Sequence, residues 1–205
     1  MDELIVLRPG YVLADPPKPA LAGHSVVVRG ERIEAVMASG DTPADAKVLE
    51  FPGATLMPGL IDAHVHLTLC GCCAPRQTMM QENNDILLLR AGENARLALR
   101  AGITTLRDCG DRGAVTFTLR EAISRGVLPG PRLLVSGPPL TSPRGHCYFM
   151  GGEVDGRDRV DPRARCREDG PRSLVACSQR RGDRMKRLPP ELAQSHPWAA
   201  DRAAS

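Results

Sequence analysis

The chain has 205 residues, of which 42% are hydrophobic and 3% are aromatic, and its formal net charge is +3. This length suits one or two ordinary domains. The sequence contains neither a secretory signal peptide nor an apolar run long enough to span a membrane, so we expect a cytoplasmic protein with no membrane partner.

The positive charge belongs to the last quarter of the chain. Residues 157–205 hold 12 Lys and Arg against 7 Asp and Glu, whereas the first 156 residues hold 15 against 17. The arginines are scattered, and the aromatic side chains that would stack on bases are scarce, so we expect no nucleic-acid partner. The 7 cysteines are expected to be reduced thiols, as is usual in the cytoplasm.

The N-terminal part is predicted to be rich in short strands. Residues 4–13 have a strand pattern, and residues 25–36 form a predicted hairpin that turns at 29–32. We expect residues 1–57 to form a small β-sandwich-type element, which is too short to bury a core by itself.

Residues 58–67 read PGLIDAHVHL, an apolar run that carries two histidines. Because side chains alternate across a strand, Asp62, His64 and His66 are predicted to share one face. Two imidazoles at the end of a buried strand make half of a divalent-metal site. The alternative is a pair of solvated or core histidines. It is disfavoured by the spacing, the preceding Pro-Gly turn and the cost of unpaired imidazoles in an apolar run.

Three cysteines, Cys70, Cys72 and Cys73, follow these histidines. A zinc knuckle would need a second C-x-x-C pair at a suitable distance, and the sequence has none. We therefore expect these thiols to be incidental residues of a loop.

The next segment alternates between helical and extended patterns. The predicted elements are a helix at 85–100, a strand at 103–108, a helix at 114–125 and a strand at 132–136. Asn84 is the expected N-cap of the first helix, and Gly102 and Gly126 follow the last apolar positions of the two helices. This alternation indicates a parallel sheet with right-handed crossovers.

Polar residues follow the second and third of these strands. Arg107 and Asp108 end the second strand, and an ion pair or a helix cap is the expected role for them. His146 lies in a Gly-rich loop after the third strand, where a plain loop histidine and a substrate-binding histidine remain equally open.

Residues 57–67 resemble the amidohydrolase superfamily of metal-dependent hydrolases, in which the first barrel strand ends in H-x-H and is typically written PGLIDxHxH. The resemblance extends upstream over the hairpin and the segment 48–59, and downstream to about residue 156. The stretch HCYFMGGE at 146–153 is most similar to the imidazolonepropionase-like and Xaa-Pro dipeptidase-like branch.

This resemblance implies an α/β fold in which residues 58–156 form the first three βα units of a TIM-like (β/α)8 barrel. It further implies that His64 and His66 are ligands of a divalent metal, with zinc expected, and that His146 contacts substrate. The implied reaction is hydrolysis of a carbon–nitrogen bond in a small amide, dipeptide or cyclic amide by a metal-activated water.

The same resemblance implies that the chain is incomplete. A TIM barrel has eight strands and about 250 residues, and no counterpart is found for the later ligands or for the catalytic aspartate. We expect residues 157–205 to be an irregular Arg-rich tail, and the metal-bridging role of the family's lysine is not assigned to Lys186. The alternative function is therefore a non-catalytic, truncated fragment that binds metal weakly and self-associates through an exposed sheet edge.

A reading-frame slip near residue 160 is one explanation of the irregular tail. A single slip does not restore the enzyme, because the shifted frame meets a stop codon across Met185 and Lys186. Sequencing that finds the frame intact, with unrelated DNA downstream, would exclude the slip.

Overall fold

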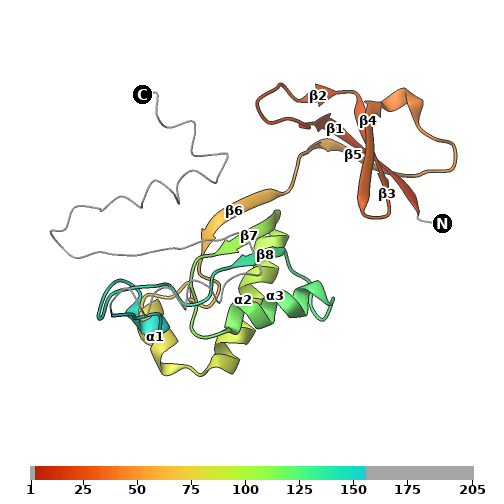
Figure 1. The fold of residues 1–205 in the computed structure, drawn as a ribbon. Coiled ribbons are helices and arrows are strands. Elements are labelled where there is room, and N and C mark those ends of the chain that lie inside the picture. Colours follow the sequence, from red (N-terminus) through yellow and green to blue (C-terminus); the bar gives the residue numbers. More distant parts are fainter. Residues whose placement is uncertain (1–2, 156–205) are drawn as a thin grey trace, which may run out of the picture. The chain divides into compact units, whose positions relative to one another are not determined.

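The computed structural model describes residues 3–155, so the predictions for the tail and for Lys186 lie outside the described residues. The described part of the chain divides into two compact units, with the boundary between Leu60 and Ile61 (Figure 1).

The first unit is built around β1 (Leu4–Val12), which pairs antiparallel with β3 (His24–Arg29) and parallel with β5 (Lys47–Leu56). The remaining elements are β2 (Leu21–Ala22), β4 (Arg32–Ala38) and the short 3-10 helix η1 (Ser39–Asp41). The predicted hairpin is confirmed as β3 and β4. The five strands belong to one sheet, where the sequence suggested a sandwich-type element.

The core of this sheet is small. Leu4 and Val6, which are two residues apart and so lie on the same face of β1, pack with Val27 of β3. Partly buried hydrophobic residues, among them Ala35 and Val48, pack around these three.

The second unit is an α/β structure with the strand order β6-β7-β8. Its elements are β6 (Leu60–Val65), α1 (Pro75–Gln81), α2 (Asn84–Arg100), β7 (Ile103–Asp108), α3 (Val115–Ser124), β8 (Arg132–Val135) and the short 3-10 helix η2 (Tyr148–Met150). The strands β7 and β8 are parallel, as the alternation of helical and extended patterns predicted. Their core includes Leu87 and Ala91 of α2, Leu106 of β7 and Leu119 of α3.

The ends of α2 show how local sequence sets an element boundary. The side chain of Asn83 accepts a hydrogen bond from the backbone N–H of Ile86, so Asn83 is the N-cap in place of the predicted Asn84. Gly102 follows the helix at φ +88°, a conformation that favours glycine at this position. No helix within residues 3–155 has both the length and the apolar character needed to cross a membrane.

The strand β6 differs from its prediction as a buried strand. Leu60 is 48% exposed and Ile61 is 72% exposed. The physical reason is the strand order, because β6 lies at one edge of the sheet that the described residues form. The histidines at its end are therefore more accessible than the apolar run suggested.

Candidate metal and substrate site

His64 lies near the end of β6, and His66 lies just after it. Their ring centroids are 5.3 Å apart, and the rings are nearly perpendicular. Two imidazoles that share one tetrahedral ion at Zn–N distances of about 2.1 Å would have centroids about 5 Å apart. The pair therefore fits as two ligands of one metal ion.

The second histidine is held by the neighbouring strand's loop. Nδ1 of His66 lies 3.0 Å from the backbone carbonyl oxygen of Gly110, which can accept a hydrogen bond only if Nδ1 carries the proton. In that tautomer Nε2 has a free lone pair, which is the form in which an imidazole binds metal.

Asp108, the last residue of β7, has a different role from the ion pair or helix cap that its position suggested. Its carboxylate accepts hydrogen bonds from the backbone N–H of Leu67 at 2.8 Å and of Gly110 at 3.1 Å. The side chain is fully buried. Burial raises the pKa of Asp108 to about 7, and the nearby charge of Asp111 also raises it, while the two N–H groups act in the opposite direction.

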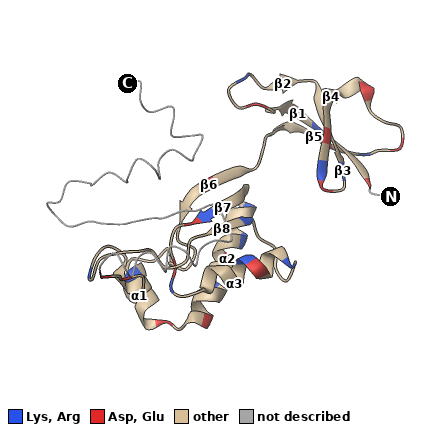
Figure 2. Cartoon of the chain, in the orientation of Figure 1, with Lys and Arg blue, Asp and Glu red and all other residues tan. Residues whose placement is uncertain are grey.

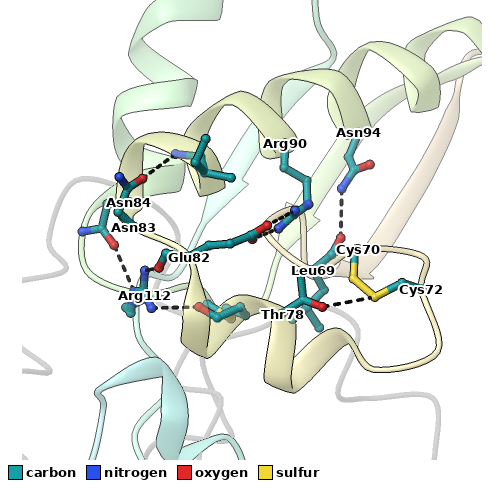
Figure 3. Close-up of polar contacts among 12 residues, drawn as sticks. Leu69, Cys70, Cys72, Thr78, Glu82, Asn83, Asn84, Arg90, Asn94 and Arg112 are labelled. Carbon is teal, nitrogen blue, oxygen red and sulfur yellow. Dashed lines mark hydrogen bonds and ion pairs between the residues drawn. A yellow bond between two sulfur atoms is a disulfide. The ribbon is translucent and has the colours of Figure 1, made fainter.

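The loop after β6 is anchored to the middle of α2. The side-chain amide of Asn94 donates to the carbonyl of Leu67 at 2.8 Å and to the carbonyl of Leu69 at 3.0 Å; Figure 3 draws the second of these hydrogen bonds. Immediately after this anchor, a disulfide joins Cys70 to Cys72 (Figure 3). The prediction of reduced thiols is therefore wrong for this pair.

Two arginines, Arg90 and Arg112, bind the C-terminal end of α1 and the residue that follows it (Figure 3). Glu82, which follows it, forms a two-point ion pair with Arg90 of α2. Arg112, in the loop after β7, donates to the backbone carbonyls of Met79 and Glu82. The hydrogen bond from Arg90 holds the pKa of the Glu82 carboxyl below its usual range. The loop that carries Gly110 is thus bonded to the C-terminal end of α1.

His146 is exposed, in the segment between β8 and η2. Arg144 and Cys147, on either side of it, have φ values of +57° and +60°. Such left-handed residues other than glycine are uncommon and are enriched at functional sites. The backbone N–H of Arg144 donates to Glu153, which fixes one end of this turn.

The loops that carry His66 and His146 pack against the same hydrophobic cluster, that of the second unit. A Cβ built on Gly110 would lie 3.4 Å from the sulfur of Met150, which is buried in one cluster with Leu67. Across the surface, the Arg76 guanidinium lies 4.9 Å from the centre of the Tyr148 ring. The structure brings His64 and His66 together, and places His146 on a neighbouring loop.

Within residues 3–155 no group of three or more His, Cys, Asp and Glu side chains is arranged to hold a metal ion. In this part of the chain the candidate donors that lie next to each other are His64 and His66, with ring centroids 5.3 Å apart. Figure 2 shows that acidic and basic residues are interspersed along the described part of both units.

Sequence reasoning missed the roles of Asp108, Gly110 and Asn94. The only signal was the position of Asp108 at the end of a predicted strand, next to the strand that carries the histidines. A buried aspartate at that point is a candidate for satisfying backbone N–H groups of neighbouring loops.

Residues 55–187 match the amidohydrolase family. An imidazolonepropionase of Klebsiella pneumoniae (strain 342) is 31% identical, over 50% of this chain and 30% of that relative. The solved structure of a Xaa-Pro dipeptidase with bound methionine in the active site has a TM-score of 0.70 and 25% identity, over 80% of this chain and 44% of that chain. A prolidase complexed with N-methylphosphonate-L-proline has a TM-score of 0.65 and 30% identity, over 80% and 43% of the two chains. This chain spans less than half the length of these relatives.

Proposed function

Because the chain belongs to the amidohydrolase family, we propose that it serves in the metal-dependent hydrolysis of a carbon–nitrogen bond in a small amide. The observation that carries this proposal is the pair His64 and His66, 5.3 Å apart, with His66 held through Nδ1. A histidine fixed in this way presents Nε2 to a ligand.

The proposal includes the architecture around the pair. We take β6, β7 and β8 as the first three strands of a TIM-like barrel, whose active site forms at the carboxyl ends of the strands. The parallel pairing of β7 with β8 supports this, and so does the position of the histidines at the end of β6. His146 follows β8, so it would lie at the same end of the sheet.

In this site His64 and His66 would hold a divalent ion, with zinc as the expected metal. When bound, such an ion lowers the pKa of a coordinated water toward neutrality and polarises the substrate carbonyl. His146, held between two left-handed residues, would orient a polar group of the substrate. A durable four-coordinate site needs at least three protein ligands, so further donors would have to come from outside residues 3–155.

The relatives indicate a substrate class. The imidazolonepropionase name points to a cyclic amide, and the prolidase and dipeptidase titles point to dipeptides that end in proline. We therefore propose small, peptide-like or cyclic amides as the substrates.

Zinc binding and hydrolysis by the purified 205-residue chain test the proposal together. Zinc per chain would be measured by mass spectrometry after equilibration, and hydrolysis with dipeptides of the Xaa-Pro type and with a cyclic imidazolone. His64→Ala and His66→Ala should each abolish zinc binding. His24→Ala is the matched control, because Nδ1 of His24 also lies 2.8 Å from a backbone carbonyl oxygen, in the first unit, and its loss should change nothing.

The possible results separate the proposal from its alternative. Zinc bound through both histidines together with measurable turnover supports the hydrolase. Zinc that binds without any turnover favours a non-catalytic chain, and zinc binding that survives the loss of both histidines contradicts the site itself.

A further inference from the structure

We propose that Asp108 is a positioning residue for His66, because one buried carboxylate holds both the residue after His66 and the residue that accepts from its ring. Through these two bonds Asp108 would fix His66 in the tautomer that leaves Nε2 free for metal. The inference rests on the proposed function only for the claim that Nε2 binds a metal. The tautomer of the His66 ring does not depend on that function.

The first step is the contact of the ring itself. Nδ1 of His66 lies 3.0 Å from the carbonyl oxygen of Gly110. A carbonyl oxygen can only accept, so in the neutral ring this distance assigns the proton to Nδ1 and the lone pair to Nε2. The direction of the Gly110 carbonyl therefore decides which nitrogen of His66 faces a ligand.

The second step is the carboxylate that holds both partners of this contact. One oxygen of Asp108 accepts from the backbone N–H of Leu67 at 2.8 Å, and the other accepts from that of Gly110 at 3.1 Å. Leu67 follows His66 directly, so its N–H fixes the backbone next to the ring. Asp108 is thus a bridge between the histidine's backbone and the backbone whose carbonyl meets its side chain.

The third step is that Asp108 and the backbone it contacts are held rigidly in place. Asp108 is fully buried, so water does not compete for its hydrogen bonds. The loop is also pinned by the hydrogen bond from Cys109 N–H to the carbonyl of Val65, at 2.9 Å. A Cβ on Gly110 would lie 3.1 Å from Cδ of Pro139, so the Gly110 backbone is closely packed.

The first measurement is the tautomer of His66 in the metal-free chain. Long-range 15N–1H NMR at a pH where imidazole is neutral distinguishes a proton on Nδ1 from one on Nε2. The expected wild-type result is a single Nδ1–H form. A wild-type ring protonated on Nε2 would overturn the inference without the need for any variant.

The second measurement uses Asp108→Asn, in which an NH2 group replaces one accepting oxygen. We expect the variant to lose the single tautomer and to bind zinc about 10-fold or more weakly in a competition titration with a chromogenic chelator. The matched control is Asp111→Asn, a second fully buried aspartate in the same loop, whose carboxylate accepts from Thr116 N–H at the start of α3. That control should keep both the tautomer and the zinc affinity.

These readouts separate the two proposals. If the wild-type chain binds no zinc but shows the Nδ1–H form, which is lost only in Asp108→Asn, the positioning role stands and the proposed function fails. If Asp108→Asn and Asp111→Asn change the tautomer equally, Asp108 acts only through general stability and the inference is wrong.

Discussion

Nη1 of Arg112, in the loop after β7, lies 2.9 Å from the backbone carbonyl oxygen of Met79 in α1. Carbonyls in the last turn of a helix have no partner within the helix, so a side chain from another element can satisfy them. Arg112 also donates to the carbonyl of Glu82 and to the side chain of Asn84. One guanidinium thus joins α1, the start of α2 and the loop after β7 (Figure 3).

Arg112→Ala should lower the free energy of unfolding by about 1 to 3 kcal/mol, because it leaves partly buried carbonyls without a donor. Urea denaturation followed by circular dichroism measures this change. Arg125→Ala is the control, since Arg125 forms an exposed ion pair with Glu121 and its removal should cost less than about 0.5 kcal/mol. Equal losses in the two variants would contradict the role given to Arg112.

The free energy of unfolding should depend on pH because of the titration of Asp108. Its pKa is raised from 3.8 to about 7, so between these values the folded chain keeps a proton that the unfolded chain releases. The stabilisation is therefore complete below about pH 4 and is lost as the pH rises through about 7. Urea denaturation at a series of pH values measures it. The difference in unfolding free energy between wild type and Asp108→Asn should change with pH across this window, and a constant difference would contradict the prediction.

The cysteines should differ in their reactivity toward iodoacetamide. Cys73 is exposed and should react first, whereas Cys109 is buried, and burial raises the pKa of its thiol. Cys70 and Cys72 should take up two alkyl groups only after treatment with a reductant. Peptide mapping by mass spectrometry reads each site separately, including Cys166 and Cys177, which lie outside the described residues. Alkylation of Cys70 in chain that has not been reduced would contradict the disulfide.

Thr68→Val should raise the free energy of unfolding, by about 1 kcal/mol. The hydroxyl of Thr68 is buried and has no hydrogen-bond partner within the described residues, and valine keeps the shape of the side chain. Thermal and urea denaturation measure the gain. Ser25→Ala is the contrasting control, because the buried Ser25 hydroxyl donates to Ser39 and its removal should destabilise the chain. A loss of stability in Thr68→Val would mean that the hydroxyl has a partner in solution.

Local sequence predicted the elements whose boundaries local chemistry sets. The apolar spacing of Leu87, Ala91 and Ala95 gives α2 its buried face, and Gly102 ends it. The predicted strand at 103–108 has the observed bounds of β7. The H-x-H motif likewise indicated the histidine pair, because side chains two residues apart in a strand point to the same face.

Features that depend on distant residues were not predictable in this way. Asp108 satisfies backbone groups 41 and 2 positions away, and only the fold brings Leu67 to it. The short helix α1 has seven residues, too few for an apolar period to be distinguished from a loop. The exposure of β6 depends on which strands lie beside it, which the strand's own apolar run does not reveal.

The hydrogen bonds from the Asn94 side chain to the carbonyls of Leu67 and Leu69 divide the loop after β6 into two parts. The two parts differ in whether they can accept inserted or deleted residues. Up to Leu69 the chain must keep its residue count, because one inserted residue would move a carbonyl out of reach of the amide and shift the backbone beside His66. Beyond Leu69 the exposed residues 71–73 carry no such constraint from Asn94. Insertions and deletions among natural variants of this chain are therefore expected to gather after position 69, and to be absent between His66 and Leu69.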